Sequence, residues 1–407
     1  MTEASQHDKG PQVHRAVEGS EVIGYVVIDS TIGGRSAGGL RMMPDVDEAE
    51  LRELAHTMTL KYGFLGMPIG GAKAGVRCSP EAPLEERRQR LAAFARAVAP
   101  LLQTGAYTPG TDMGTDTADI VYVMQSVGVP VSQAELEGIH SAYYTAMTVL
   151  SGVRQALRHV GMPMAHCRVA IEGWGKVGSV VGELLAEAGA CIVALSTVHG
   201  ALFDPQGFDV TALQALAHEY GSHFPERYQG AQQLPREALL SAEVDVLCPC
   251  ARHHSVHAAN ADSVSARIVC PGANNALTAK AEQMLFRRGV LCLPDFVTNS
   301  GGVLGGTLEG ALATRAQIAA FIEKHIDRRV AWLIEEATRR QVSPRDIAVP
   351  LALKRFEAMR HRASLVTTMS HLTQLQRFGM RLLDRGWVPR GLAARVIGAF
   401  LARSLAW

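Results

Sequence analysis

One short stretch constrains the fold of this chain more than any other. Residues 168–171 form an apolar run typical of a buried strand, and a G-x-G-x-x-G pattern follows at residues 173–178 before a helical pattern begins. In such a turn the first glycine permits a tight bend, the second lets backbone amides approach a pyrophosphate, and the third lets the helix pack against the strand. The stretch therefore predicts a strand–turn–helix unit whose helix N-terminus binds a dinucleotide.

The turn and the strand after it supply the expected cofactor contacts. In the turn these are Gly173, Gly175, Lys176, Val177 and Gly178. The next strand is expected at residues 191–196. The acidic residue that usually binds the adenosine ribose at its end is missing, because Thr197 and His199 stand there. Without a carboxylate to repel a 2′-phosphate, NAD and NADP both suit the sequence, with Thr197 as the expected contact and His199 or Lys176 as the neutralising cation.

Alternating strand and helix patterns continue beyond this unit. Further strand-like runs lie at residues 244–248, 268–270 and 290–293, and two of them lead into loops that carry Asn274 and Asn299. Open α/β sheets bind ligands at the carboxyl ends of their strands, so we expect Asn274 to contact the cofactor and Asn299 the substrate. The alternative is that both asparagines are turn residues in the left-handed conformation.

A second chemical feature is a pair of lysines in the apolar, glycine-rich stretch at residues 58–76. A capping box of Asp45 and Glu48 precedes an amphipathic pattern that predicts a helix ending near Lys61. An alternative to a chemical role for Lys61 is that it compensates the helix dipole as a cation in the last turn. Lys73 ends a Gly-Gly-Ala-Lys sequence. Burial lowers the pKa of a lysine and makes it a base near neutral pH, whereas a glycine-rich turn would leave both lysines solvated.

The remaining N-terminal segments give weaker signals. Residues 1–20 are polar and are expected to lack regular structure, residues 21–29 resemble a strand, and glycines between residues 33 and 39 break the chain. A helix is expected at residues 85–102. From the residues alone, Asp112 is a turn aspartate or the cap of the helix that follows.

The composition argues against several classes of protein. The 40 Lys and Arg residues balance 39 Asp and Glu residues, so no global field recruits nucleic acid. Seven cysteines in mostly apolar runs favour reduced thiols, and Cys248 and Cys250 lack the second cysteine pair of a metal site. The polar N-terminus and the absence of a long apolar run predict a cytoplasmic protein without a membrane span. The basic segment at residues 385–407 is expected to pack on its own fold or a sister subunit, with a membrane-surface helix as the alternative.

Taken together, the motifs resemble the glutamate/leucine/phenylalanine/valine dehydrogenase family over roughly residues 20–360. They occur in the family order at residues 38–41, 58–61, 70–76, 111–115, 173–178, 272–274 and 294–303. The resemblance implies an α/β fold of two domains separated by a cleft. These are an N-terminal substrate-binding and oligomerisation domain at residues 1–140 and a Rossmann-like domain at residues 141–340, with C-terminal helices at residues 341–407 that pack back on the first domain.

The resemblance also implies roles for individual residues. Lys61 would hold the substrate α-carboxylate, Lys73 would activate water and stabilise the carbinolamine, and Asp112 would exchange protons with the amino group. Oxidative deamination needs these three functions. Gly39 is a further expected substrate contact. Thr145 occupies the position that contacts the nicotinamide carboxamide, with Thr148 in place of a usual glycine.

Two departures from the family bear on the substrate. Glutamate-specific members have a lysine where this chain has Ala37 and a serine where it has Gly306. Burying an unpaired carboxylate is costly, so the sequence predicts an apolar or aromatic L-amino acid, with Gly305 and Gly306 leaving space for it.

The implied activity is NAD(P)-dependent, reversible oxidative deamination of an L-amino acid to a 2-oxo acid and ammonia by a homo-oligomer, with no metal ion. The alternatives are a glutamate dehydrogenase with displaced carboxylate recognition and a non-catalytic paralogue that serves as a subunit. Intact Lys61, Lys73 and Asp112 argue against the paralogue.

Overall fold

The chain has two sheets, each in its own compact unit. The computed structural model describes residues 10–131, 140–310 and 313–368. One unit consists of described residues 10–131 and 351–368, and the other of residues 140–310 and 313–350. The unit boundary at residue 350 falls within α13 (Pro344–Thr368). The predicted two-domain α/β fold with a Rossmann-like sheet is confirmed, and the basic segment at residues 385–407, for which packing on its own fold or a sister subunit is predicted, lies outside the described residues.

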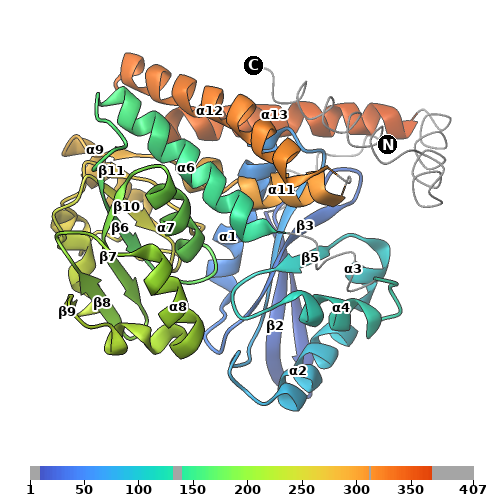
Figure 1. Ribbon diagram of the computed structural model, residues 1–407. Helices are drawn as coiled ribbons and strands as arrows, with labels where there is room; N and C mark the ends of the chain where they lie inside the picture. The colour runs from blue at the N-terminus through green and yellow to red at the C-terminus, as the bar shows by residue number, and fades with distance from the viewer. Residues whose placement is uncertain (1–9, 132–139, 311–312, 369–407) are drawn as a thin grey trace. The chain divides into compact units, whose positions relative to one another are not determined.

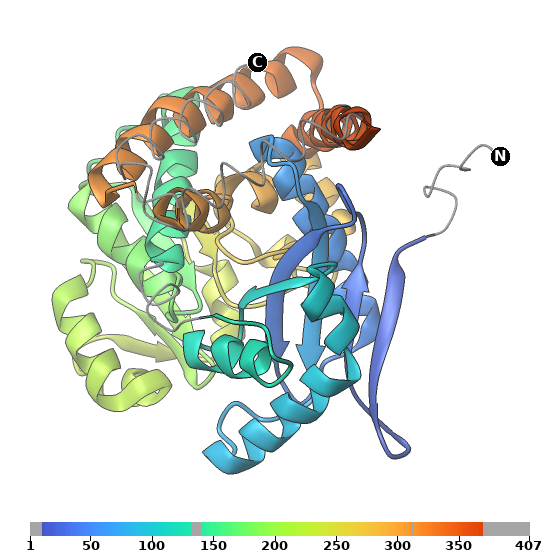
Figure 2. The same cartoon turned by 90° about the vertical axis from the view of Figure 1, so that its right-hand side faces the viewer.

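The first unit is built on a mixed five-stranded sheet in the order β1-β2-β4-β3-β5 (Figures 1 and 2). Its elements are β1 (Gln12–Glu18), β2 (Glu21–Ile28), β3 (Ser36–Met42), α1 (Glu48–Leu65), β4 (Gly70–Val76), α2 (Leu84–Ala97), α3 (Ala99–Thr104), β5 (Thr108–Thr111) and α4 (Thr117–Gln125). The central strand β4 is antiparallel to β2 and parallel to β3. A core that includes Leu40, Phe94 and Tyr107 packs this sheet against its helices.

The glycine-rich stretch forms β4 itself, and all seven of its residues are buried. A solvated turn, the alternative interpretation of this stretch, is therefore wrong. A Cβ atom on Gly71 would lie 2.2 Å from the backbone nitrogen of Thr59, and one on Gly70 would lie 2.0 Å from the carbonyl oxygen of Ser30. Glycine in this strand thus lets α1 and the neighbouring chain approach the backbone closely.

Three further expectations for this unit are wrong. Part of the polar N-terminal segment forms β1, which pairs with β2 in an antiparallel hairpin around Gly19 (Figure 2). Gly38 and Gly39 continue a strand, because β3 runs through them. The N-cap of α1 is Asp47, whose carboxylate accepts a hydrogen bond from the Glu50 amide, and not Asp45.

The second unit contains a seven-stranded sheet in the order β12-β11-β10-β6-β7-β8-β9 (Figure 1). Its first elements are α6 (Ser141–His159), β6 (Arg168–Glu172), α7 (Gly178–Glu187), β7 (Cys191–Thr197), β8 (Gly200–Phe203), α8 (Val210–Tyr220), the 3-10 helix η2 (Gly221–Arg227), β9 (Gln232–Leu234) and η3 (Arg236–Ser241). The later ones are β10 (Val246–Pro249), η4 (Ala261–Ser263), β11 (Ile268–Val269), α9 (Ala279–Arg287), β12 (Leu291–Cys292), α10 (Asp295–Thr298), α11 (Gly301–Gly310), α12 (Arg315–Arg340) and the start of α13.

The strand order locates the ligand-binding edge of this sheet. The strands from β12 to β7 are parallel, and β8 and β9 are antiparallel additions. The chain leaves β6 for β7 on one side and later places β10 on the other side. Ligands of open α/β sheets bind at such a switch point, outside the carboxyl ends of the strands.

Among the described residues, no helix is both long and apolar enough to cross a membrane.

A buried ion-pair network fixes the start of α13 within this unit. Arg345 Nε lies 2.5 Å from Glu282 Oε2, and Arg345 Nη2 lies 2.7 Å from Asp295 Oδ1. The other oxygen of Asp295 accepts a hydrogen bond from the backbone N–H of Asn275. Burial alone would lower the pKa of Arg345, but the two carboxylates raise it above the usual range. The network therefore joins α13 to α9, α10 and the loop after β11.

We predict that Arg345→Met lowers the free energy of unfolding by about 3–5 kcal/mol, because it leaves two buried carboxylates without their cation. Urea denaturation followed by circular dichroism will measure the change. Arg339→Met is the matched control, since Arg339 pairs with Glu336 on the exposed surface of α12. An effect of Arg345→Met no larger than that of the control would contradict the prediction.

Candidate active site

Lys73 and Asp112 come together in the first unit. Lys73 lies in β4 and is 2% exposed, and Asp112 directly follows β5. The Lys73 Nζ atom is 2.8 Å from Asp112 Oδ2. Asp112 forms a turn with Thr115, but it does not cap α4, because Asp116 caps that helix. The carboxylate of Asp112 is thus directed to the lysine.

Gly39 makes this approach possible. A Cβ atom on Gly39 would lie 2.8 Å from Asp112 Cβ and 3.1 Å from Lys73 Nζ. On the preceding residue, Gly38, a Cβ atom would lie 1.7 Å from the carbonyl oxygen of Ala72. The two glycines of β3 therefore create room for the lysine–aspartate pair and for close pairing with β4.

Two further charges complete a buried network that sequence reasoning missed. Arg41 Nε lies 3.1 Å from Asp112 Oδ2, and Arg41 Nη1 forms an ion pair with Glu50 Oε1. Both side chains are almost fully buried. Positive and negative groups thus alternate from Lys73 through Asp112 and Arg41 to Glu50. The signal was present in the sequence, since Arg41 ends the Gly-Gly-Leu-Arg motif, but Glu50 gives no signal of its own there.

The network and its burial shift the pKa values of Lys73 and Asp112. Burial lowers the pKa of Lys73 below the ordinary lysine value of 10.5; the charge of Arg41 adds to this effect, and Asp112 opposes it. Burial alone would raise the pKa of Asp112, but Lys73 and Arg41 together lower it from 3.8 to about 2. Asp112 is therefore ionised at neutral pH, beside a lysine that loses its proton more readily than usual.

Lys61 lies near the end of α1 and is 4% exposed. Gly66 ends this helix in the left-handed conformation, and the last turn contains no basic residue. Compensation of the helix dipole by Lys61 in the last turn, one alternative from the sequence, is therefore wrong. Because the helix backbone at Thr59 packs directly on Gly71, Lys61 belongs to a helix held against the strand that carries Lys73.

In the second unit the three turn glycines have distinct surroundings. Gly173 has φ +89°, and a Cβ atom there would lie 2.7 Å from the backbone of Ala251. A Cβ atom on Gly178 would lie 2.0 Å from the Gly173 carbonyl oxygen, whereas one on Gly175 meets no described atom within 4 Å. The first and third glycines are therefore required by packing, and the second leaves open backbone of the kind that a pyrophosphate needs.

The other residues of this predicted site surround the same turn. Lys176 is exposed, and Val177 is the N-cap of α7. The Val177 side chain lies 3.3 Å from the place of a Cβ atom on Gly272, in the loop after β11. Thr197 ends β7 and is 6% exposed, and its hydroxyl oxygen accepts a hydrogen bond from the His199 amide.

Asn274 and Asn299 contact each other through their side chains. Asn299 Nδ2 donates a hydrogen bond of 2.9 Å to Asn274 Oδ1. Neither has positive φ; the left-handed residue of this loop is Asn275, so the left-handed interpretation of the pair is wrong. Asn299 is 4% exposed, and its Oδ1 atom has no hydrogen-bond partner among the described residues. A buried acceptor of this kind suits an amide donor on a ligand such as nicotinamide.

Thr145 and Thr148 lie on α6, and Thr148 connects this helix to α11. Thr145 donates a hydrogen bond to the Ser141 carbonyl group, and Thr148 accepts one from the Gly301 N–H. Thr148 is fully buried. The residue that departs from the family pattern thus forms part of the contact between two helices.

Gly306 lies on α11, where the preceding residue corrects one expectation. A Cβ atom on Gly305 would lie 2.1 Å from the Tyr144 ring, so this ring already fills the space beside it. The ring is held in place by a hydrogen bond from the Tyr144 hydroxyl to Glu309. Gly305 therefore leaves no room for a substrate, and only Gly306 keeps its proposed role in size selection.

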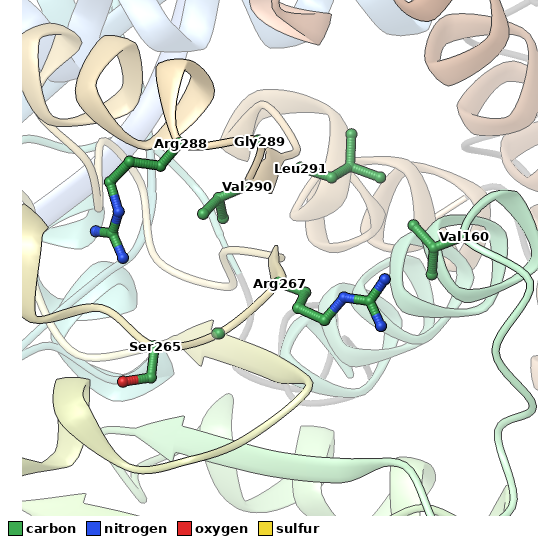
Figure 3. A pocket seen from close by; sticks show the side chains of 8 residues that line it. Val160, Ser265, Arg267, Arg288, Gly289, Val290 and Leu291 are labelled. Carbon is green, nitrogen blue, oxygen red and sulfur yellow. The ribbon is translucent and has the colours of Figure 1, made fainter.

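Two other features of the second unit, the Cys250 thiol and a pocket, are not suited to the predicted chemistry. Burial raises the pKa of the Cys250 thiol to about 12, so a thiolate ligand is disfavoured there. A pocket of about 280 Å³ is lined by Val160, Ser265, Ala266, Arg267, Arg288, Gly289, Val290 and Leu291. It lies at the amino ends of β11 and β12, opposite to the ligand-binding edge, and Figure 3 shows Arg267 and Arg288 pointing to different sides of it.

Comparison with known proteins finds a family match in each of the two units. The profile described as glutamate/leucine/phenylalanine/valine dehydrogenase matches residues 138–363, and that family's dimerisation domain matches residues 12–128. A glutamate dehydrogenase of Thermotoga maritima is 31% identical over 295 residues, covering 69% of this chain and 70% of the relative. An NAD-specific glutamate dehydrogenase of Staphylococcus aureus is 27% identical over 360 residues, with coverages of 83% and 86%.

Solved structures agree on the fold. The hetero-hexameric glutamate dehydrogenase of Thermus thermophilus, in a leucine-bound form, superposes with a TM-score of 0.73 at 24% identity, covering 86% of this chain and 87% of that one. The chain therefore belongs to the glutamate/leucine/phenylalanine/valine dehydrogenase family and is an NAD(P)-dependent amino-acid dehydrogenase.

Proposed function

We propose that the protein oxidatively deaminates an L-amino acid with an apolar or aromatic side chain, with Lys73 and Asp112 as its catalytic residues. The buried pair of Lys73 and Asp112, at 2.8 Å, carries this proposal. A base is needed to activate water, and a lysine whose pKa is lowered by burial, beside an ionised carboxylate, is suited to that role.

In the proposed reaction Lys61 binds the α-carboxylate of the substrate as a buried positive charge. Asp112 Oδ2 accepts a proton from the substrate ammonium group. A bound nicotinamide cofactor would supply the acceptor for the hydride that Cα loses. Neutral Lys73 Nζ then takes a proton from the water that adds to the imine, and Asp112 returns its proton to the nitrogen of the carbinolamine. As the carbinolamine hydroxyl group passes its proton to the ionised Asp112, the C–N bond breaks, the carbonyl group of the 2-oxo acid forms and ammonia leaves.

The residues proposed to bind the dinucleotide all belong to the second unit. The open backbone at Gly175 suits the pyrophosphate, Thr197 suits the adenosine ribose, and Asn274 suits the nicotinamide ribose. Thr145 and the unpaired oxygen of Asn299 are the candidates for the carboxamide, whose NH₂ group donates hydrogen bonds. Asn299 is thus a candidate for binding the nicotinamide carboxamide, because its oxygen has no partner among the described residues, and also for binding the substrate, as the sequence predicts.

The preference for an apolar side chain rests on Ala37 and Gly306. Ala37 lies in β3 opposite Gly71 and Thr108, and Gly306 lies on α11. The methyl side chain of Ala37 cannot pair with a carboxylate, and Gly306 has no side chain. A buried carboxylate without a partner is costly, so glutamate would bind poorly.

A second candidate function is glutamate dehydrogenase. It is favoured by the names of the relatives from Thermotoga maritima and Staphylococcus aureus, and it requires a cation from elsewhere in the chain for the side-chain carboxylate. Initial rates with NAD and NADP across a panel of L-amino acids distinguish the two candidates. Glutamate turnover as efficient as that of leucine or phenylalanine would favour the second. In either case we propose a homo-oligomer, because residues 12–128 match a dimerisation domain.

For Lys73→Ala we predict a loss of about 100- to 10,000-fold in kcat with unchanged dinucleotide affinity, because only the base is removed. Stopped-flow rates of NADH formation and a fluorescence titration with NADH measure the two effects. Lys280→Ala, at an exposed position on α9, is the control and should behave like the wild type. Wild-type activity of Lys73→Ala would disprove the assigned base.

Asp112→Asn should move the pH–rate profile in a direction fixed by the charges. Asp112 opposes the lowering of the Lys73 pKa, so removing its charge lowers that pKa further. Deamination needs neutral Lys73, so the rate rises as pH increases through this pKa. We expect the rising limb of kcat/KM to shift to lower pH in the variant, with a reduced maximum. A shift to higher pH would contradict the assignment.

The substrate proposal predicts that Ala37→Lys combined with Gly306→Ser raises the ratio of kcat/KM for glutamate over leucine by about 10–100-fold, because a charged partner then meets the carboxylate. Ala37→Met with Gly306→Ser is the matched control, since methionine has similar length without charge. If both double variants change the ratio equally, the charge at position 37 does not select the substrate.

A further inference from the structure

Two histidines outside the proposed reaction lie face to face beyond the end of β7. His199 follows β7 by two residues, and His223 lies in η2. Their ring centroids are 3.5 Å apart with an interplanar angle of 23°. Glu226, on the next turn of η2, places Oε1 3.3 Å from His223 Nδ1. The histidine–histidine–glutamate cluster formed by these three residues is exposed.

The chemistry of this cluster is that of a metal site. Imidazole nitrogen and carboxylate oxygen are usual zinc ligands, and one ligand atom from each residue lies within 4.8 Å of the other two. Around a tetrahedral zinc ion with bonds of about 2.1 Å, ligand atoms are about 3.4 Å apart. The ligand atoms would therefore have to move closer than the 4.8 Å within which they lie, and all three side chains are exposed.

A phosphate group is the other ligand that two histidines suggest, because His199 follows the strand that ends at the expected ribose contact. Glu226 decides between the two ligands. Its carboxylate lies against His223, where it would repel a phosphate group but would supply the third ligand to a cation. The cluster therefore favours a cation over an anion.

We propose that His199, His223 and Glu226 bind one divalent transition-metal ion of the zinc type, with water at the fourth position. Three protein ligands and one exchangeable position are typical of zinc sites that remain open to a further ligand. The ligands come from two segments separated in sequence, so the ion would join the end of β7 to η2.

The site has a consequence for cofactor choice, which rests on the proposed contact at Thr197. The His199 backbone N–H donates a hydrogen bond to the Thr197 hydroxyl oxygen, at 3.1 Å. A divalent cation here attracts the more negative cofactor, and its open position can accept a phosphate oxygen. Zinc should therefore strengthen binding of NADPH more than that of NADH.

Isothermal titration of the full chain with zinc chloride, in a buffer that does not bind metal, tests the site. We expect one ion per chain at this site, and a loss of affinity of at least about 10-fold in His199→Gln and in His223→Gln, because ligand-shell changes have effects of this size. His218→Gln, on the exposed surface of α8, is the matched control. Cobalt(II) absorption bands give a second readout that does not depend on enzyme activity.

Two results would overturn the site: no zinc binding by the wild type, or equal binding by the wild type and the His199→Gln/His223→Gln double variant. Thermal melts of the variants confirm that they are folded. NADPH and NADH titrations with and without zinc test the consequence separately. Equal strengthening of both cofactors would overturn the effect on cofactor choice, whereas loss of the Lys73 assignment leaves the metal site unaffected.

Discussion

The first unit depends on a buried chain of charges. Lys73, Asp112, Arg41 and Glu50 alternate in sign, and three of the four side chains are at most 5% exposed. Removing charges from water is costly, so each must be paired within the network. Burial, with the charge of Arg41, leaves the lysine with a lowered pKa despite its pairing with Asp112, and Lys73 and Arg41 keep the aspartate ionised. One arrangement thus satisfies the requirements of both folding and the proposed chemistry.

The glycines of this unit follow from that constraint. The Lys73–Asp112 ion pair joins β4 to the residue after β5 across β3, and only a residue without a Cβ atom fits beside it at Gly39. Gly71 likewise lets α1 pack directly on β4, which brings the helix of Lys61 against the strand of Lys73. A stretch that looks flexible in the sequence is therefore a buried central strand, because its glycines permit close packing rather than motion.

The sequence was sufficient to predict the structure where the local pattern and the packing agree. The strand–turn–helix unit at residues 168–187 could be predicted because each glycine has a local reason, and Gly173 and Gly178 have the surroundings that the pattern requires. The partner of Lys73 could be named only through the family resemblance, since Asp112 alone indicates a turn.

Features that depend on how separate elements pack together could not be predicted. Arg41 in β3 and Glu50 in α1 are only nine residues apart, but their ion pair depends on the packing of the helix on the sheet, and periodicity reports only which face of a helix is buried. Gly305 suggested free space beside α11, but the ring of Tyr144, from α6, already fills that space. The sequence of β1 has no strong apolar pattern, because β1 is an edge strand. It is held in the sheet by its pairing with β2.

The central claim is that Lys73 is a buried base with a lowered pKa. It can be tested directly by NMR titration of protein carrying ¹³C at the lysine Cε position, with Lys73→Met to assign the resonance. The account predicts that the Lys73 resonance titrates below the ordinary value of 10.5 and that Asp112→Asn lowers this pKa further. A Lys73 pKa at or above 10.5 would contradict the account.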